Sequence, residues 1–308
     1  MNVAVFGGTG FIGSYIVDEL LKSGKHPLLL VRPGSENKVF RRNEITLIYG
    51  DVHNTDSICE ILNGCDAVIY NIGIIRENKA KNINFNALHF EGARRTADLS
   101  LEFGVSRFLL MSANGVKPDG TAYQKTKYFA EEYIKSTDIA WTIFRPSVVF
   151  GNPRGNTEFC SRLRDEIIRS PLPAPLFFTG LLPKNAGMFE TAPVHVKDVA
   201  SVIVKSLDTD ETIGRTISLC GPDRINWKIL MKLISKASGK GKLTVPVPVV
   251  AVKTAAFFLE RFPSFPVTRD QITMLMEGNI CDSHEVFELF GIEPIRFSLK
   301  NLDYLKND

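Results

Sequence analysis

The chain has 308 residues, with 37 Lys and Arg against 34 Asp and Glu and a formal net charge of +3. At about 150 residues per domain, this length is enough for one large domain or two coupled ones with a sizeable core. Apolar residues make up 44% and charged residues 23%, which excludes a disordered polyelectrolyte. The near-balance of charge gives no reason to expect a nucleic-acid partner.

The cysteines form no CxxC pair and no metal-ligand spacing. There are five of them, at positions 59, 65, 160, 220 and 281. An odd number in a chain of this size predicts free thiols in a reducing compartment, with no disulfide framework and no bound metal.

Residues 1–17 are uncharged and could be mistaken for a targeting segment. Glycines and polar residues interrupt this run and no basic region precedes it, so it predicts a strand and a turn. No other run approaches the roughly 20 apolar residues that a membrane helix needs. We therefore expect a cytoplasmic protein that is peripheral to a membrane at most.

Apolar runs of strand length alternate with segments of helical period in the first half of the chain. This alternation predicts an α/β fold with a doubly wound, Rossmann-type parallel sheet. The first helix should begin in a glycine-rich turn and end near 22–24, where a basic residue precedes a capping glycine. Residues 71–82 are polar and without period, as expected of a loop beside a ligand crevice. The expected strands are 2–6, 27–31, 45–49, 66–70, 107–112 and 140–144.

The alternation stops beyond residue 150, where proline-rich stretches at 171–183 and 245–248 separate short elements. We expect a dinucleotide-binding core at 1–150, to which 191–221 returns. A small C-terminal lobe for a substrate or partner is expected from 151–190 and 222–308.

A glycine-rich turn stands directly between the first strand and the first helix. Its sequence is Gly7-Gly8-Thr9-Gly10-Phe11-Ile12-Gly13. In such a turn the first glycine makes the sharp bend, the middle one admits a pyrophosphate to the backbone, and the last lets the helix approach the sheet. The alternative is a glycine turn that binds no nucleotide, but the strand-turn-helix context favours nucleotide binding.

The end of the second strand indicates which nucleotide binds. A site for NAD usually has an acidic residue there, whereas a site for NADP has a cation for the 2′-phosphate. Val31 occupies the expected acidic position and Arg32 follows it, which favours NADP(H) over NAD(H). Arg41 and Arg42 are better explained as a solvated surface pair.

Tyr123 and Lys127 are four residues apart and should share one face of a helix. An ammonium beside the phenol would lower the pKa of Tyr123 and prepare it for acid/base catalysis, and it could also hold the nicotinamide ribose. Ser112, at the end of the fifth strand, could orient a substrate oxygen. A YxxxK pattern alone is common on exposed helices, but its position after the polar loop makes this match more specific.

Several motifs resemble, in order and over nearly the whole chain, those of the extended and atypical short-chain dehydrogenase/reductase superfamily of the NAD-dependent epimerase/dehydratase type. They are GGTGFIG at 7–13, Gly50-Asp51-Val52, Asn71-Ile72-Gly73, the Tyr123–Lys127 pair, RPSVVFG at 145–151 and PVHVKDV at 193–199. A finer resemblance is to the branch that contains the nucleotide-binding accessory subunit of respiratory complex I and its bacterial relatives. HFEGARR at 89–95, RPSVVFG and PVTRD at 266–270 carry that resemblance.

The resemblance implies roles for matching residues. Asp51 would contact the adenine amino group, Asn71 and Gly73 would line the adenosine ribose, and Pro146 with its following backbone would lie beside the nicotinamide. Asp51 has a rival explanation as a turn residue. The catalytic set so implied is Tyr123, Lys127 and Ser112, and the cofactor set is Gly7, Gly8, Thr9, Gly10, Phe11, Ile12, Gly13, Arg32, Asp51, Val52, Asn71, Ile72, Gly73, Lys127, Pro146 and Val148.

Three features depart from sugar-nucleotide epimerases. Ser112 precedes Tyr123 by only 11 residues and is followed by Ala113, and His89 stands where an asparagine is usual. Two functions therefore stay open. One is an NADP(H)-dependent oxidoreductase or epimerase that acts on a carbonyl or hydroxyl. The other is a non-catalytic subunit that holds NADPH within a larger, respiratory-type complex.

The apolar segment 249–262 bears on possible partners. It could dock on a membrane surface or on a protein, or it could be a helix packed into the small lobe. Related enzymes often dimerise through helices corresponding to 84–103 and 121–136, so a homodimer is a further expectation. The sequence carries no recognisable signature of a particular small-molecule substrate.

Overall fold

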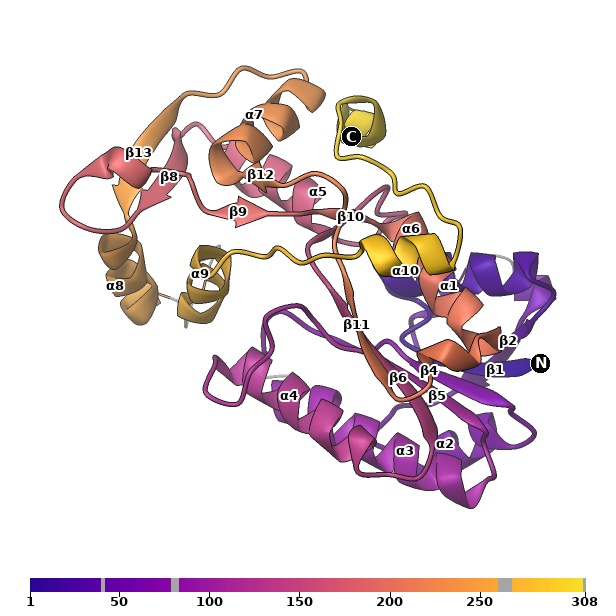
Figure 1. Cartoon of the computed structure of the whole chain (residues 1–308). Coiled ribbons are helices and arrows are strands. Elements are labelled where there is room, and N and C mark those ends of the chain that lie inside the picture. The colour runs from indigo at the N-terminus through magenta and orange to yellow at the C-terminus, as the bar shows by residue number, and fades with distance from the viewer. Residues whose placement is uncertain (40–41, 79–82, 260–267, 307–308) are drawn as a thin grey trace. The chain divides into compact units, whose positions relative to one another are not determined.

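The computed structural model describes residues 1–39, 42–78, 83–259 and 268–306. The chain divides into two compact units, each formed from three segments (Figure 1). The first unit comprises Met1–Pro146, Val196–Leu219 and His284–Ile292, and the second comprises Ser147–His195, Cys220–Ser283 and Glu293–Asp308.

A seven-stranded parallel sheet forms the centre of the first unit. Its strands are β1 (Asn2–Phe6), β2 (His26–Val31), β3 (Thr46–Tyr49), β4 (Ala67–Tyr70), β5 (Arg107–Met111), β6 (Ala140–Pro146) and β11 (Arg215–Leu219). Their order across the sheet is β11-β6-β5-β4-β1-β2-β3, and every neighbouring pair is parallel. The predicted Rossmann-type fold is confirmed, with six of the seven strands close to their expected positions.

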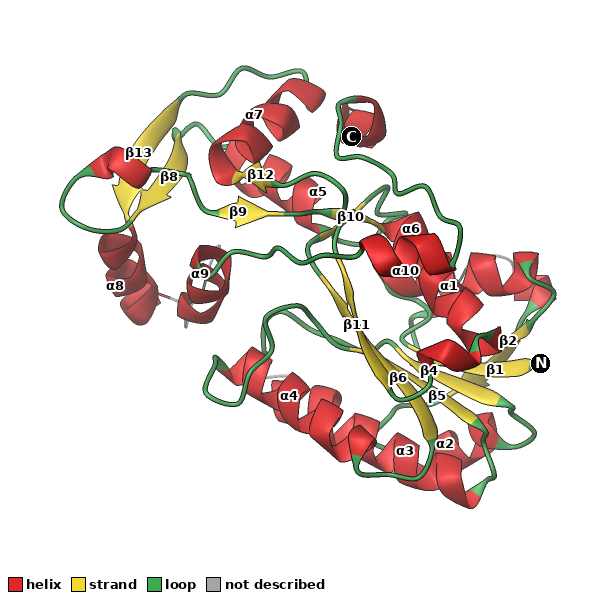
Figure 2. Ribbon diagram, in the orientation of Figure 1, coloured by secondary structure: helices red, strands yellow, loops and turns green. Residues whose placement is uncertain are grey.

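Helices cover both faces of this sheet (Figure 2). They are α1 (Phe11–Lys22), α2 (Thr55–Leu62), α3 (Gly92–Glu102), α4 (Ala122–Lys135), α6 (Val196–Lys205) and α10 (His284–Leu289). Helices α2, α3 and α4 lie on one face over a core that includes Phe6, Tyr70 and Phe108, and α1 packs against α6 on the other. Helix α1 ends as predicted, with Gly24 in the left-handed region at φ 70°.

The second unit is built from short elements around its own aromatic core. Its helices are α5 (Phe159–Leu163), α7 (Trp227–Ala237), α8 (Val249–Leu259) and α9 (Arg269–Met276). Its strands are β7 (Val149–Phe150), β8 (Ala174–Phe178), β9 (Glu190–Thr191), β10 (Val194–His195), β12 (Ile225–Asn226) and β13 (Thr244–Pro248). Trp227 is 2% exposed and stacks on Phe189.

The proline-rich stretches, expected to separate elements, instead contain strands. β8 and β13 pair in parallel as an isolated two-stranded sheet, with Val245 opposite Pro175 and Pro246 opposite Leu176. Each strand has only one neighbour, so the missing N–H group of a proline can face the unpaired edge. A sheet of two edge strands therefore tolerates prolines that a central strand would not.

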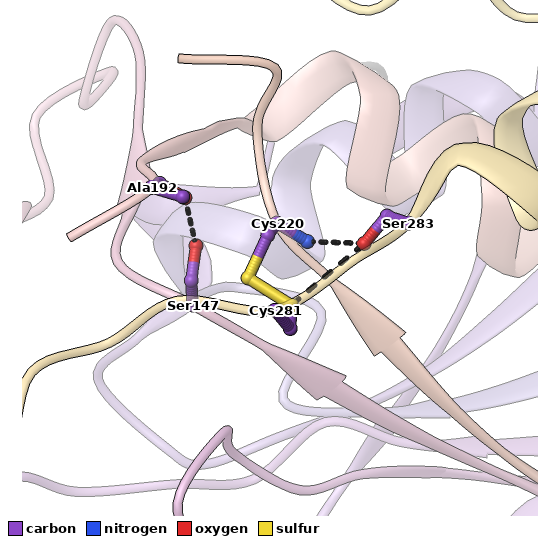
Figure 3. The surroundings of a disulfide bond; sticks show 5 residues. All are labelled: Ser147, Ala192, Cys220, Cys281 and Ser283. Atoms are coloured by element: carbon purple, nitrogen blue, oxygen red, sulfur yellow. Dashed lines mark hydrogen bonds between the residues drawn. A yellow bond between two sulfur atoms is a disulfide. The ribbon is translucent and has the colours of Figure 1, made fainter. Parts of the chain in front are cut away.

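The expectation of five free thiols is wrong at two positions. Cys220 and Cys281, 61 residues apart in the sequence, form a disulfide in the second unit (Figure 3). The N–H group of Cys220 also donates to Ser283 Oγ at 2.7 Å, which fixes the backbone beside the bond. Cys59, Cys65 and Cys160 are free.

The apolar segment at 249–262 is described as far as Leu259 and forms α8. Val249 and Ala256 are buried, whereas Val250, Phe257 and Phe258 are 59–75% exposed. The helix is thus packed on one side only, and residues 260–262 lie outside the described part of the chain. Within the described ranges, no helix is both long and apolar enough to cross a membrane.

Candidate active site

The strand order of the first unit defines where a ligand should bind. From β1 the chain builds outward through β2 and β3, and then returns to the other side of β1 to add β4, β5 and β6. The switch point lies between β1 and β4, and in open α/β sheets ligands bind beside the carboxyl ends of the strands at this point. The glycine turn follows β1 and residues 71–73 follow β4, so the structure brings these two predicted segments together there.

Two glycines of the turn are required by the packing of the protein itself. Gly7 has φ 86°, and a Cβ atom on it would lie 2.9 Å from the carbonyl oxygen of Asn71. A Cβ on Gly13 would lie 2.1 Å from the carbonyl oxygen of Gly7. These contacts hold the start of α1 tightly against the strand ends.

Gly10 differs from both. Its backbone is extended (φ −80°, ψ 176°), and the nearest atom to a Cβ would be Gly7 O at 3.4 Å. Gly10 is the N-cap of α1, which has neither a side-chain cap nor an acidic residue in its first turn. The first N–H groups of α1, together with the open space at Gly10, fit the pyrophosphate of a dinucleotide.

Arg32 leaves the end of β2 as an exposed side chain, while Val31 before it is fully buried. The Arg32 guanidinium makes no hydrogen bond or ion pair with another residue of the described ranges. By contrast, Lys22 pairs with Glu19 at 3.3 Å and Lys25 with Asp208 at 2.5 Å. Arg32 is therefore available to an anion, and Arg41 lies outside the described residues.

Asp51 and Val52 follow β3. Asp51 Oδ1 accepts a hydrogen bond from the N–H group of His53 at 2.9 Å, which is the turn role considered from the sequence. Val52 is 3% exposed, and its carbonyl oxygen accepts from Arg95. The turn uses only Oδ1 of Asp51, so Oδ2 could still contact the adenine amino group. That contact stays a prediction.

Helix α4 brings Lys127 to the switch point. A capping box between Thr121 and Gln124 fixes the start of this helix. Lys127 Nζ donates to Met111 O at the end of β5, at 2.8 Å, and it lies 3.6 Å from the Cβ position of Gly73. The ammonium therefore stands between the loops that follow β4 and β5.

Burial lowers the pKa of Lys127 from 10.5 to about 8, and the carboxylate of Glu131 opposes this shift. Lys127 is only 5% exposed. An ammonium placed here at a cost in solvation is typical of a functional site, where ligand contacts offset that cost.

Tyr123 lies against the edges of two rings. The centre of the Tyr123 ring is 5.7 Å from that of Phe85 and 5.2 Å from that of His89. Lys127 Nζ lies 5.9 Å from the centre of the Tyr123 ring. Partial burial raises the pKa of Tyr123 to about 12, the opposite of the lowering that was expected from Lys127. Desolvation is the only cause of this shift, with no opposing contribution from Lys127, and no described residue hydrogen-bonds the hydroxyl.

His89 links the loop after β4 to α4. Its Nε2 accepts from the N–H group of Ile74 at 3.1 Å, so its Nδ1 carries the proton and donates to Thr126 Oγ1 at 3.2 Å. Burial, and to a lesser extent Lys127, lowers the pKa of His89 to about 2, which keeps the ring neutral. Thr126 was not identified from the sequence.

Ser112 belongs to a buried polar cluster. Its hydroxyl donates a short hydrogen bond to Glu131, a carboxylate with no exposed surface, and Arg145 Nε donates to the same group at 2.9 Å. Sequence reasoning did not identify Glu131 or Arg145. The i,i+4 spacing of Lys127 and Glu131 is the only local signal of this cluster.

The last two predicted cofactor residues fall in different units. Pro146 ends β6, and its carbonyl oxygen accepts from Asn114 N at 2.9 Å. Val148 lies in the second unit, where its carbonyl oxygen accepts from Val194 N at 2.9 Å. No cluster of three or more potential metal ligands occurs in the described part of the chain.

Lys127→Met should raise the free energy of unfolding at pH 7 by about 1–3 kcal/mol, because the variant buries no ammonium. In the folded protein the pKa of Lys127 is about 8, below its ordinary value of 10.5. When the native sequence unfolds, Lys127 therefore keeps its proton up to a higher pH than it does in the folded state. The stability of the native protein should therefore rise between pH 8 and 10.5, and that rise should be smaller in the variant.

Urea unfolding at pH 7 and pH 10 would measure both effects. Lys125→Met, at an exposed position of the same helix, is the control. If the Lys127→Met variant has a lower free energy of unfolding at pH 7 than the native protein, Lys127 instead stabilises the fold.

Comparison with known proteins agrees with this geometry. A family model described as NAD(P)H-binding matches residues 7–167, more than half of the chain. The chain therefore belongs to this NAD(P)H-binding family. Its structural neighbours are in the epimerase/dehydratase group of the short-chain dehydrogenase/reductase superfamily.

The curated relatives that the chain matches include a complex I subunit and a reductase. The mitochondrial 40 kDa subunit of NADH-ubiquinone oxidoreductase from Neurospora crassa is 27% identical, over 99% of this chain and 79% of that protein. A ceramide reductase from Caulobacter vibrioides is 26% identical, over 86% of this chain and 80% of that protein. The structure of UDP-glucose 4-epimerase from Thermus thermophilus with NAD has a TM-score of 0.72 at 17% identity, covers 100% of this chain and 98% of that one, and supports the fold alone.

Proposed function

We propose that the chain is an NADP(H)-dependent oxidoreductase or epimerase that acts on a carbonyl or hydroxyl group of a small-molecule substrate through Tyr123 and Lys127. The observation that carries the proposal is the position of Lys127 Nζ, 2.8 Å from Met111 O and 3.6 Å from the Cβ position of Gly73. This position is on the same edge of the sheet as the glycine turn. Cofactor and acid/base pair would then meet at the switch point.

The nicotinamide supplies or accepts the hydride when it is bound. In the reducing direction, Tyr123 donates its hydroxyl proton to the substrate oxygen, and a phenol with a pKa near 12 holds that proton ready at neutral pH. The Lys127 ammonium favours the phenolate that results. Ser112 donates a hydrogen bond to Glu131, and its oxygen lone pairs stay available to accept a hydrogen bond from a substrate hydroxyl. An epimerase would use the Tyr123 transfer in both directions.

The cofactor would contact the glycine turn with its pyrophosphate and Arg32 with its 2′-phosphate. Asp51, Val52 and Asn71–Gly73 would surround the adenosine, and Pro146 and Val148 the nicotinamide. No atom would lie closer than 3.4 Å to a Cβ on Gly10, and Arg32 is exposed with no partner among the described residues; both observations support this arrangement.

A specific observation favours a second function. No described residue orients the Tyr123 hydroxyl, and the match to the Neurospora crassa complex I subunit extends over 99% of the chain. The alternative is therefore a non-catalytic subunit that holds NADPH within a larger complex. In that case Tyr123 and Lys127 would clamp the cofactor without turnover.

Turnover distinguishes the two functions. Mass spectrometry of small molecules released from the purified protein would identify the nucleotide, and the absorbance of reduced nicotinamide would then be followed against a panel of carbonyl substrates. Oxidation that depends on a carbonyl supports the enzyme. Tight binding without oxidation by any member of the panel supports the subunit.

Arg32→Ala should lower the preference for NADPH over NADH at least about fivefold, roughly 1 kcal/mol, because a charge-assisted contact to the 2′-phosphate is lost. Affinity for NADH should change little. Titration of both nucleotides measures the ratio, and Arg42→Ala removes the same charge from another exposed position. Equal affinities in the native protein would refute the NADP(H) assignment.

A further inference from the structure

The second unit contains a pocket that is strongly basic. Five lysines line it: Lys228, Lys232, Lys236, Lys240 and Lys242. No Asp or Glu is among its lining residues. This excess of one charge in one concavity is unusual in a chain whose net charge is only +3.

Secondary structure explains how the lysines converge. Lys228, Lys232 and Lys236 recur every four residues along α7 and so lie on one face of that helix. Like charges at this spacing destabilise a helix, and no acidic side chain on α7 compensates them. The lysine face therefore has no compensating charge on its own helix.

The loop that follows α7 brings the remaining two lysines. It is fixed to the helix end, since Lys240 N donates to Ser235 O at 3.1 Å and Ser235 Oγ donates to Lys240 O at 2.5 Å. Lys242 Nζ donates to the carbonyl oxygen of Ser170, which ties the loop to the segment before β8. The cations are therefore held in place before a ligand arrives.

Four of the five ammonium groups are available to a ligand. Lys228, Lys232, Lys236 and Lys240 are exposed, and none has a side-chain hydrogen bond or ion pair within 1–39, 42–78, 83–259 and 268–306. The acidic residues of the neighbouring helical turn are already paired, Asp165 with Arg164 and Arg169, and Glu166 with Arg162. Nothing described in this unit neutralises the lysine face.

The floor of the pocket is apolar. Ile168, Ala174 and Met231 line it and are at most 3% exposed. Two exposed leucines lie near these residues in the sequence. Leu243 stands between the lining residues Lys242 and Thr244 and is 82% exposed, and Leu172 stands two residues before Ala174 and is 71% exposed. The peptide N–H group of Ala174 donates to Leu243 O at 2.8 Å, so both leucines belong to the same end of the β8–β13 sheet.

We propose that this pocket binds the phosphate group of an anionic ligand. Lysines are strongly hydrated point charges that bind phosphate from several directions, and the pocket volume of about 590 Å³ is large enough for a phosphorylated head group. The exposed leucines favour a phospholipid as the source of the phosphate, because they would contact acyl chains beside it. The site is independent of the nucleotide site of the first unit.

The test uses the full chain with two probes. Vesicles of phosphatidylcholine with phosphatidylglycerol are compared with phosphatidylcholine alone by co-sedimentation, and inorganic tripolyphosphate is titrated by calorimetry. Lys232→Gln/Lys236→Gln should weaken binding at least about tenfold, since each lysine near an anionic surface contributes severalfold. Lys300→Gln/Lys306→Gln removes the same charge from exposed positions outside the pocket lining and should change binding less than about threefold.

Pocket-dependent binding to the mixed vesicles identifies a lipid phosphate, and pocket-dependent binding to tripolyphosphate alone identifies a soluble one. Repeating the titration in a Gly10→Val background removes any contribution from the glycine turn. Absence of binding to both probes, or equal losses in the two double variants, would overturn the proposal. Because neither probe is a nicotinamide nucleotide, these outcomes are separate from the fate of the proposed oxidoreductase.

Discussion

Tyr123→Phe should lower turnover by at least about 100-fold and leave cofactor affinity almost unchanged. The substitution removes one hydroxyl and keeps the ring, so the edge contacts with Phe85 and His89 persist. Because no described residue hydrogen-bonds that hydroxyl, its loss breaks no contact within the described part of the protein. The expected effect is therefore confined to proton transfer.

Steady-state rates and nucleotide titration measure the two quantities separately. Tyr128→Phe is the matched control, since it removes a phenol from the same helix one residue beyond Lys127. A native protein that binds NADPH, oxidises none with any carbonyl and responds to Tyr123→Phe only in thermal stability would be a subunit. Bound nucleotide would then stabilise the fold by mass action alone.

The protonation state of Tyr123 bears on the proposed proton transfer. With the pKa of the phenol raised to about 12, the protein alone favours the proton-donating form at neutral pH. Carbonyl reduction needs that form, whereas hydroxyl oxidation needs the phenolate. The lowering of the pKa expected from the sequence assumed an ammonium beside the phenol, whereas burial is the only cause acting on Tyr123 in the structure.

The features that could be predicted from the sequence are local. The glycine turn, the apolar strand runs and the cap at Gly24 each occupy a few consecutive residues, and their physical causes act over the same short range. The strand β11 was not predicted, because it lies at the edge of the sheet and its first two residues are exposed. Its place in the sheet depends on pairing with β6, more than 60 residues earlier.

The contacts that complete the site are long-range in sequence. Ile74 and His89 meet because a loop folds back on a helix, and Ser112 reaches Glu131 across a strand–helix interface. No spacing rule predicts such pairs, although the sequence shows that each of these residues can form hydrogen bonds. The disulfide between Cys220 and Cys281 could not be predicted for the same reason. An odd number of cysteines does not exclude a bond between two that are 61 residues apart.

Gly10→Val should reduce cofactor affinity at least about 100-fold, or about 2.7 kcal/mol, in a protein that stays folded. Gly10 has an extended backbone that any residue adopts, and a Cβ would have only Gly7 O nearby, at 3.4 Å. The side chain would project into space that the proposed pyrophosphate occupies, so the substitution should act on the ligand rather than on the turn. Gly10→Ala should give a smaller loss, because its side chain is smaller.

Gly13→Ala is the informative contrast. A Cβ there would lie 2.1 Å from Gly7 O, so this variant should lower the melting temperature whether or not nucleotide is present. Circular dichroism with thermal melting, run beside nucleotide titration, separates the two kinds of defect. If Gly10→Val is folded and binds NADPH like the native protein, the turn serves only to pack α1 against the sheet, and both functions proposed for this site fail together.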